Sequence, residues 1–411
     1  MIHLTEGDRM PEKLPVEFVV NPEFGRDPYA AYAALREKGP VHPIEFPPGV
    51  DGFLVVDYEH GRRALNDPRL SKNPYEGPEA FRAILGQGNP VLAHNMLNSD
   101  PPDHTRLRRL VSKAFTPRRT ESLRPRVQEI TDRLIDAMAV KGHADLLDDF
   151  AFPLPITVIC ELLGVPVEDR DDFRRWSTTL ITPPFDDEQV LRRVEANTAI
   201  RAYFVRTVAE RRAEPRDDMI SALVVARDEE ELLSENELVS TLTLLLIAGH
   251  ETTVNLIGNG MLALLANPGQ LRLLRERPEL LPSAIEEFLR YEGPVERATF
   301  RFSTDDLEIA GVHIPKRSLV HVSLGAADRD PGAFEDPDTL DITRADNRHV
   351  AFGHGVHFCL GAPLARLEAQ IAFGTLLRRL PDIALDCPPD ELSWRQDGSL
   401  IRGLRALPVR F

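Results

Sequence analysis

The sequence predicts a mainly α-helical protein with small β-sheets. Helical patterns outnumber strand patterns along the chain, and one of them is unusually long. It begins at the capping box Ser234-Glu-Asn-Glu237 and continues to Asn267-Pro268, a length of about 45–50 Å at 1.5 Å per residue. Its middle part, residues 242–248, is apolar on every side, so we expect this helix to lie buried through the centre of the fold.

The other helices are marked by their caps and breakers. Asp27-Pro28 opens a helix that Gly39-Pro40 closes, because Asp caps a helix start and Gly-Pro ends one. A short helix should end near residue 66, and another should start at about residue 100. Further helices are expected at residues 117–139, 152–163, 168–180, 189–212 and 282–291, and from the segment after Cys359 to about residue 380.

Strand patterns are short. Residues 41–44 and 52–56 predict a hairpin, and residues 298–322 and the C-terminal tail also favour strands. Segment 71–99 is rich in Gly, Pro and Asn and is predicted to be a long loop. The length of 411 residues by itself suggests two or three domains, but no linker, repeat or low-complexity tract divides the chain.

The chain is acidic, with a net charge of −16, so nucleic acid is not an expected partner. One segment departs from this balance, because it carries eight basic residues against the single acidic residue Glu121. Such an island indicates either an anionic ligand or partner, or a solvated helix face. Its basic residues are Arg106, Arg108, Arg109, Lys113, Arg118, Arg119, Arg124 and Arg126.

The three cysteines, Cys160, Cys359 and Cys387, form no metal-binding pair spacing, and their odd number argues against a disulfide framework. The N-terminal segment is polar and rich in Pro, and the sequence has no apolar run of about 18 residues. We therefore expect a cytoplasmic protein without a signal peptide or a membrane anchor, and we expect it to be a monomer.

The most informative stretch is Phe-Gly-His-Gly-Val-His-Phe-Cys-Leu-Gly at residues 352–361, which an amphipathic helix follows at once. Cys359 therefore lies just before a helix N-terminus, where unpaired N–H groups favour a thiolate. A cysteine taken alone is more often a small buried apolar residue. The glycine-rich surroundings and the absence of a partner cysteine instead favour a single thiolate bond to a large iron cofactor.

A second motif, Ala-Gly-His-Glu-Thr-Thr at residues 248–253, lies inside the long helix. A packing glycine and a Thr hydroxyl bonded back to the i−4 carbonyl would explain an isolated Gly/Thr pair. Here a small residue, an acid and a hydroxyl occur together in a buried helix, which indicates a polar notch beside a ligand.

These two motifs, together with Glu-Phe-Leu-Arg at residues 287–290, resemble the signatures of the cytochrome P450 family, and the similarity spans nearly the whole chain. The resemblance implies the cytochrome P450 fold, which is triangular and helix-rich, with haem b between the long central helix and the helix after the cysteine. It also implies a single domain over residues 1–411, richer in β-structure toward its N-terminus and in helix thereafter. Cys359 would be the axial thiolate ligand of the iron. Glu287 and Arg290, otherwise readable as a surface ion pair, would lock the segment that supports the cysteine loop.

The family pattern also implies which residues hold the haem. Glu251 and Thr252 would be the catalytic acid–alcohol pair. The haem contacts would come from His104, Arg108, Arg301 and His357 at the propionates, and from Ala248, Gly249, Phe352, Cys359 and Gly361 around the ring. The walls of the substrate pocket would include Val91, Leu92, Leu245, Ala248, Val295, Ala298 and Ile401, which are aliphatic and imply a lipophilic substrate.

By this resemblance the protein is a monooxygenase that inserts one oxygen atom of O2 into a macrolide, another polyketide or a steroid-like molecule. Electrons would come from NAD(P)H through a ferredoxin reductase and a ferredoxin, docked near Arg106, Arg109 and Lys113. Two alternatives remain open. A haem-thiolate peroxygenase would not need the Glu251–Thr252 pair, and a haem or gas sensor would be expected to carry an output domain.

Overall fold

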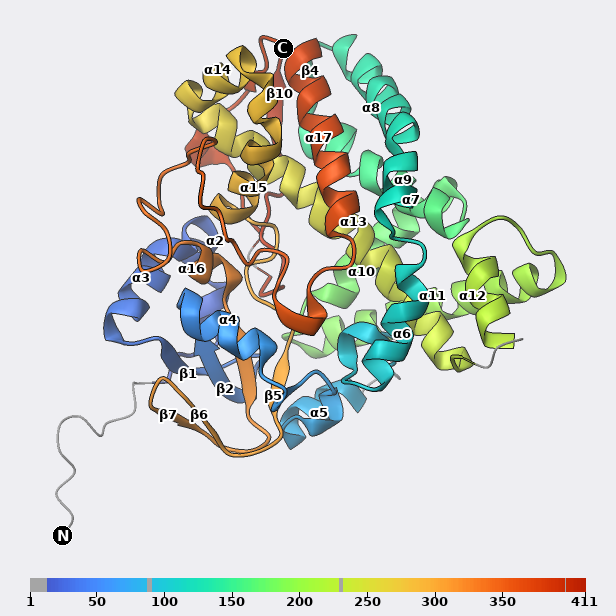
Figure 1. The fold of residues 1–411 in the computed structure, drawn as a ribbon, viewed down its shortest axis with the longest axis vertical. Helices are drawn as coiled ribbons and strands as arrows, with labels where there is room; N and C mark the ends of the chain where they lie inside the picture. Colours follow the sequence, from blue (N-terminus) through green and yellow to red (C-terminus); the bar gives the residue numbers. More distant parts are fainter. Residues whose placement is uncertain (1–12, 87–90, 229–231, 396) are drawn as a thin grey trace.

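The computed structural model describes residues 13–86, 91–228, 232–395 and 397–411. It confirms the mainly helical fold with small sheets, and its outline is roughly triangular (Figure 1). The helices of the first half are α1 (Glu17–Val20), α2 (Pro22–Arg26), α3 (Pro28–Lys38), α4 (Tyr58–Asn66), α5 (Glu79–Gly86), α6 (Asp103–Ser112), α7 (Pro117–Ser122), α8 (Arg124–Ala139), α9 (Pro153–Leu163) and α10 (Arg170–Ile181). Those of the second half are α11 (Asp187–Ala213), α12 (Met219–Asp228), α13 (Glu235–Ala266), α14 (Pro268–Glu276), α15 (Leu281–Tyr291), α16 (Leu324–Asp328) and α17 (Ala362–Arg379).

The main sheet has five strands in the order β1-β2-β8-β5-β3. Strands β2 and β8 run parallel, with Phe53 opposite Val320, and the other neighbours run antiparallel. The sheet lies beside α3 and α4 at one corner of the molecule (Figure 1). Its strands are β1 (Val41–Glu45), β2 (Asp51–Val55), β3 (Leu70–Ser71), β5 (Arg301–Ser303) and β8 (Leu319–Val322). The smaller sheets contain β4 (His143–Asp145), β6 (Leu307–Ile309), β7 (Val312–Ile314), β9 (Ala384–Leu385) and β10 (Pro408–Arg410).

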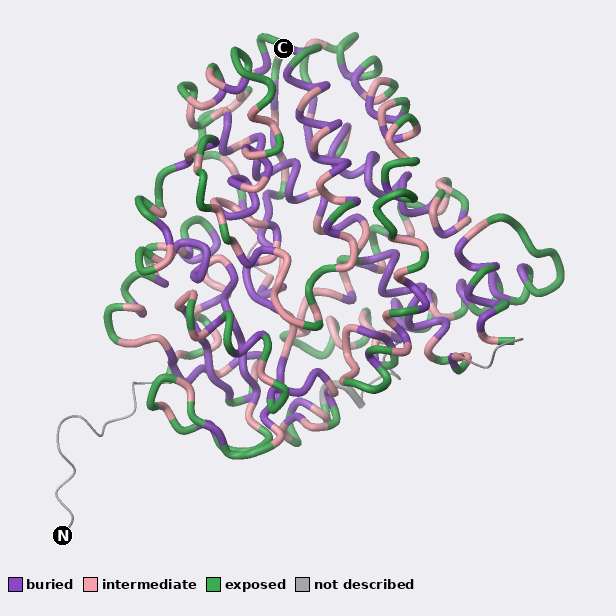
Figure 2. The backbone as a smooth tube through the Cα atoms, in the orientation of Figure 1, coloured by how far each residue is buried: buried purple, intermediate pink, exposed green. Residues whose placement is uncertain are grey.

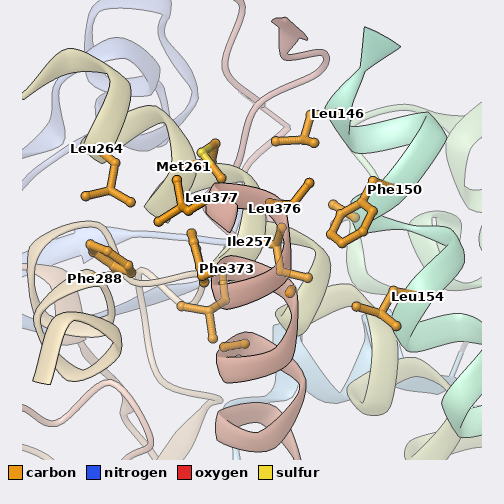
Figure 3. Packing of buried hydrophobic residues seen from close by; sticks show 14 of the residues in the cluster. Leu146, Phe150, Leu154, Ile257, Met261, Leu264, Phe288, Phe373, Leu376 and Leu377 are labelled. Atoms are coloured by element: carbon orange, nitrogen blue, oxygen red, sulfur yellow. The ribbon is translucent and has the colours of Figure 1, made fainter. Parts of the chain in front are cut away.

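The long helix predicted from the capping box is α13, and both bonds of that box are present between Ser234 and Glu237. It is buried along most of its length, and in Figure 2 the segments that cross the interior are coloured as buried. Figure 3 shows how its apolar side chains pack against α17, α15 and α9. The labelled residues are Ile257, Met261 and Leu264 of α13, with Leu146, Phe150, Leu154, Phe288, Phe373, Leu376 and Leu377 around them.

Several predicted boundaries were wrong, and proline explains most of them. The helix predicted over residues 117–139 is two helices, α7 and α8, because Pro125 lacks the N–H that would continue the ladder. Pro268 ends α13 but also opens α14, where its missing N–H costs nothing at the first helical position. The predicted loop 71–99 contains α5, and α12 was also missed.

The segment between α16 and the cysteine loop is held by one buried ion pair. Arg290 donates from Nε and Nη2 to the two carboxylate oxygens of Glu287, each at 2.8 Å, and both side chains are fully buried. The remaining bonds of the pair all reach this segment. Glu287 accepts from the Asp341 amide at 2.9 Å and from Arg344 Nε at 3.1 Å, and Arg290 donates to the carbonyl oxygens of Asp328, Pro337 and Thr339.

In the part of the chain that the structure describes, no helix has a stretch long and apolar enough to cross a lipid bilayer.

The Glu287–Arg290 pair gives a stability prediction. We expect Glu287→Ala to lower the free energy of unfolding by about 3–5 kcal/mol, because it leaves the Arg290 charge buried without a partner. Urea denaturation followed by circular dichroism measures this change. As a control, Glu279→Ala removes an exposed partner of Arg277 and should leave stability nearly unchanged. Equal effects of the two substitutions would contradict the assigned role.

Candidate active site

A largely apolar cavity lies between α13, the cysteine loop and the start of α17. Its volume is about 260 Å³, and it is partly open to solvent. Eight of the nine residues predicted to contact the haem line it, and so does Thr252; His104 does not. These eight are Arg108, Ala248, Gly249, Arg301, Phe352, His357, Cys359 and Gly361.

The cysteine loop is a tight turn that needs two of its glycines. Gly353 and Gly355 have φ angles of 74° and 76°, a left-handed conformation that side chains with a Cβ rarely adopt. The turn is closed by the Cys359 amide, which donates to the Phe352 carbonyl at 2.9 Å. Arg108 of α6 donates from Nη2 to the Phe358 carbonyl at 2.7 Å, so the turn is also fixed from outside.

The environment of the Cys359 thiol is more balanced than the sequence suggested. The thiol faces the cavity and is accessible there, but it lies deep within the protein, and this burial raises its pKa above the usual range. The amides of Gly361 and Ala362 at the start of α17, and the charges of Arg108 and Arg366, lower the pKa and partly offset this effect. The helix terminus therefore lowers the pKa of the thiol, as expected, but does not by itself produce a thiolate. A bound metal ion would produce one, because coordination deprotonates a thiol.

A second, half-buried ion pair supports the loop and was not recognised in the sequence. Glu286 accepts from Arg366 Nε and Nη2, each at 2.7 Å, and lies 3.0 Å from His349 Nε2. Arg366 also lies over the ring of Phe352, 4.6 Å from its centroid. These bonds connect α15, α17 and the first residue of the cysteine loop. The adjacent Glu286 and Glu287 thus clamp both sides of the loop.

The four cationic residues predicted at the propionates lie together. The rings of His104 and His357 have their centroids 4.3 Å apart. Burial is the main cause that lowers the pKa of His357 to about 2, and the charges of Lys72, His104, Arg301 and Arg108 act in the same direction. The acid Asp100 opposes the lowering of the pKa values of Lys72, His104 and Arg301. The cations outnumber this carboxylate, so the cluster suits a further anion.

Lys72 belongs to this cluster and was missed in the sequence, where a lysine in a polar loop gives no signal. It is fully buried, and its ammonium group donates to Thr299 Oγ1 at 2.7 Å and to the Phe300 carbonyl at 2.6 Å. Burial and Arg301 lower its pKa well below the usual value, while Asp100 opposes this shift. Burial also lowers the pKa of Arg301 to about 10.

On the α13 wall, Thr252 lines the cavity and its hydroxyl donates to the Ala248 carbonyl at 3.0 Å. Gly249 lines the cavity too, but its closest neighbour lies on α9. A Cβ at Gly249 would come within 2.7 Å of the Ile159 side chain, so this glycine allows α13 and α9 to pack closely. The structure therefore supports the simpler packing explanation for Gly249 as well as a place beside the ligand.

Glu251 does not line the cavity. Its carboxylate is buried, with Oε2 accepting from Arg395 Nη1 at 3.2 Å and Oε1 accepting from Thr178 Oγ1 at 3.3 Å. Arg395 comes from the C-terminal segment and Thr178 from α10. Glu251 and Thr252 are therefore neighbours in sequence whose polar groups point to different surroundings.

Another acid, Glu368 of α17, does line the cavity, next to Thr252 and Thr253. It is fully buried, and neither carboxyl oxygen has a geometrically sound hydrogen bond among the described residues. Burial raises its pKa to about 8, with Thr253 opposing the shift, so Glu368 is mostly protonated at neutral pH. Sequence reasoning missed it because a single Glu in an amphipathic helix is usually exposed.

Of the predicted substrate contacts, Leu245, Ala248, Val295 and Ala298 line the cavity, whereas Val91, Leu92 and Ile401 do not. Val91 instead packs in the core against α11, where its amide donates to Asn197 Oδ1 at 3.1 Å. Ile401 lies behind Val295, with which it forms a β-bridge. Lining residues that the sequence did not suggest are Met96, Leu97, Phe115, Ile159, Leu244, Leu289 and Leu324.

The basic island is only partly available for a partner. Arg106 is bonded to Asp103 and Glu237, and Arg124 and Arg126 are paired with Glu121, Glu129 and Glu161. This corrects the expectation for Arg106. Among the described residues, Arg109, Lys113, Arg118 and Arg119 are exposed and have no ion-pair partner.

The sequence matches the family model of cytochrome P450 over residues 53–394. It is 51% identical over 393 residues to cytochrome P450 107B1 of Saccharopolyspora erythraea, covering 94% of this chain and 96% of the relative. It is 50% identical over 395 residues to the cytochrome P450 monooxygenase PikC of Streptomyces venezuelae, covering 95% and 92%. Identity to the 6-deoxyerythronolide B hydroxylase of S. erythraea is 46% over 395 residues, covering 94% and 96%.

Solved structures agree with these relatives. The cytochrome P450 enzyme CxnD, for C–S bond formation in chuangxinmycin biosynthesis, superimposes with a TM-score of 0.93 at 48% identity, covering 98% of both chains. The tirandamycin C-bound P450 monooxygenase TamI gives a TM-score of 0.89 at 46% identity, covering 97% of this chain and 99% of the other. The chain therefore belongs to the cytochrome P450 family of haem-thiolate monooxygenases.

Proposed function

We propose that this protein binds haem b through Cys359 and inserts one oxygen atom of O2 into a lipophilic small molecule. The observation that carries the proposal is the cavity itself. A single thiol faces it from the cysteine loop, a Thr hydroxyl faces it from α13, and a buried group of cations that outnumbers the nearby acid Asp100 lies at one side.

The residues present fit a haem. Two propionates would supply the missing negative charge to His104, Arg108, Arg301 and His357, and Lys72 adds a fifth cation. Neither ring nitrogen of buried His104 has a hydrogen-bond partner among the described residues, so His104 is available to donate to a propionate. The apolar lining suits a porphyrin face, and the single thiol suits one axial bond.

When bound, the haem iron would supply the binding and activation of O2. The chain's own part is to orient and to supply protons. With haem bound, Cys359 would hold the iron through its thiolate, and the apolar side chains of Leu244, Leu245 and Val295 keep bulk water out of the cavity. Thr252 would offer a hydroxyl to the cavity once it releases the Ala248 carbonyl.

Two acids can supply those protons. Glu251 holds its carboxylate behind α13, where it must leave Arg395 before it can serve the cavity. Glu368 already faces the cavity and keeps its proton at neutral pH, because burial raises its pKa to about 8. The proposal therefore assigns proton delivery to Thr252 with Glu251, and adds Glu368 as a second source on the α17 side.

A macrolide or another polyketide is the substrate class that we propose. The cavity lining is mainly aliphatic, as a lipophilic substrate requires. Relatives are named as a 6-deoxyerythronolide B hydroxylase and as a mycinamicin IV hydroxylase/epoxidase, the second 44% identical over 380 residues, covering 92% of this chain and 94% of the relative. Hydroxylation or epoxidation of such a molecule is the reaction that this lining and these relatives favour.

For electron supply, we propose an acidic ferredoxin, reduced by its NAD(P)H-dependent reductase, that docks beside the cysteine loop. Arg109 and Lys113 offer free positive charge there, and Val356 and Phe358 of the loop are 53% and 41% exposed. A patch with free cations around exposed apolar side chains suits a small acidic partner, because charge steers the encounter and apolar contact holds the complex.

The first prediction from the proposed function concerns Cys359 as the thiolate ligand of the iron. We expect the purified, haem-loaded protein, when reduced and exposed to CO, to show the far-red Soret band that thiolate ligation gives, and Cys359→Ala to lose this band. Cys387→Ala, which removes a different free thiol, should keep the far-red band. A far-red band that survives in Cys359→Ala would overturn the assignment of the thiolate. Product formation with ferredoxin but not with peroxide alone would reject a peroxygenase.

The second prediction concerns Thr252. With a ligand selected by its spin-state shift as substrate, Thr252→Ala should lower the product formed per NAD(P)H consumed by about tenfold or more, and release hydrogen peroxide instead, because the hydroxyl is lost. Thr243→Ala is the matched control, since Thr243 also donates to its i−4 carbonyl but lies outside the cavity lining. Equal coupling in both variants would count against a role in proton delivery.

The third prediction concerns the partner. Arg109→Glu and Lys113→Glu should slow reduction by ferredoxin, most strongly at low ionic strength, and leave substrate binding unchanged. Stopped-flow reduction under CO measures the rate. Arg192→Glu, on the exposed side of α11, serves as the control for a simple change of net charge. If the two cysteine-side variants are reduced as fast as this control at low salt, the docking site lies elsewhere.

A further inference from the structure

His250 lies between the two motif residues Gly249 and Glu251, yet the proposed function gives it no role. It is fully buried in α13, with the ring of Phe152 at 6.0 Å. Its Nδ1 is 2.7 Å from the Leu246 carbonyl, an atom that can only accept a hydrogen bond. Nδ1 therefore carries a hydrogen, and in the neutral ring Nε2 presents a lone pair.

That lone pair has no partner among the described residues, and the nearest charged atom is Glu251 Oε1 at 3.8 Å. An imidazole lone pair and an ionised carboxylate are both acceptors, so they repel each other when no proton lies between them. The distance is too long for a hydrogen bond, so sharing a proton requires the two atoms to approach each other. One proton between the two atoms turns an unfavourable contact into a favourable one.

The charges around the pair are few. Burial lowers the pKa of His250 and Arg174 of α10 lowers it further, whereas Glu251 and the Leu246 carbonyl raise it. Arg174 is itself paired with Asp148. On the other side, Arg395 binds Glu251 Oε2 and is also 3.4 Å from Asp397, so it has an alternative acid when Glu251 leaves.

We propose that His250 Nε2 and Glu251 Oε1 share one proton, and that His250 is thereby the positioning residue that sets how often Glu251 is protonated. The proposal rests on the proposed function, since it deepens the role of Glu251 in proton supply.

The step involves one proton and no other atom. When the proton moves from Nε2 to Oε1, the imidazolium becomes neutral and the carboxylate becomes a carboxylic acid. A neutral Glu251 no longer attracts Arg395, which turns to Asp397, and the acid is free to move toward Thr252. After it donates its proton there, the carboxylate is again ionic and returns to Arg395.

Nitrogen NMR of the haem-loaded protein, reduced and CO-bound so that it is diamagnetic, tests this proposal. The histidines carry ¹⁵N in their rings, and His250→Phe identifies the His250 signals. We expect the Nε2 signal of His250 to change with pH in the unmodified protein. In Glu251→Gln the change should disappear or shift to lower pH, because an amide cannot ionise. In Arg395→Gln it should shift to higher pH, because the carboxylate then keeps the proton more readily.

His349, which lies 3.0 Å from Glu286 and is remote from Glu251 in sequence, is the control within the same spectra and should not respond to either substitution. A second measurement follows the product formed per NAD(P)H in His250→Phe as a function of pH. A shared proton predicts that the pH profile moves, whereas loss of packing alone would lower stability and leave the profile in place.

The proposal is overturned if His250 titrates identically in the unmodified protein and in Glu251→Gln, or if its Nε2 does not respond to pH in either. Because the NMR measurement needs no substrate, such a result would leave the monooxygenase proposal intact. Conversely, loss of the far-red CO band would reject the haem-thiolate assignment without bearing on the pair of His250 and Glu251.

Discussion

The pair of Glu287 and Arg290 joins α15 to the segment that leads into the cysteine loop, and the rest of the site depends on it. Two buried charges with bidentate geometry are costly to separate, so the segment from Asp328 to Arg344 has one arrangement. Glu286, the preceding residue on α15, fixes Arg366 and His349 on the other side of the loop. A single turn of helix therefore holds Cys359 in register with α13.

A second constraint is electrostatic. Lys72, His104, Arg108, Arg301 and His357 lie close together, and burial lowers the pKa of each. Neighbouring cations add to this shift at Lys72, His104 and His357, whereas Asp100 opposes it at Lys72, His104 and Arg301. Like charges that gather in a protein interior are unfavourable unless an anion joins them, so the same cluster would both favour the proposed haem propionates and fix their position.

The proton chemistry follows from the different surroundings of three groups on or beside α13. Glu251 is held by Arg395 and faces away from the cavity, His250 offers an unpaired lone pair next to it, and Glu368 faces the cavity in its neutral form. Environment rather than residue type separates the two acids, because Glu251 is bonded to Arg395 whereas the carboxyl oxygens of Glu368 have no hydrogen-bond partner among the described residues. In the proposed function, α13 therefore separates the Glu251 carboxylate from the cavity in which its proton would be used.

Local patterns predicted the elements whose signals are local. The capping box of α13 predicted its start, Pro268 predicted its end, and the glycines around Cys359 predicted a tight turn that Gly353 and Gly355 indeed form. The predictions around Pro125 and Pro268 were incomplete, because a proline without an N–H both ends one helix and can open the next, here α8 and α14. A short helix such as α5 was missed because its propensity is weak and tertiary packing decides it.

The sequence by itself determined the family, the position of the cysteine before a helix and the set of residues available to a cofactor, because these depend on residue identity and spacing. Only the tertiary structure decided which side chains meet. In the structure, Lys72 lies among the cations and Glu368 lines the cavity. Glu251 is bonded to Arg395 and does not line the cavity, and Arg106 is paired with Glu237. These outcomes depend on burial and on partners more than a hundred residues away along the chain, and neither is encoded in any local stretch.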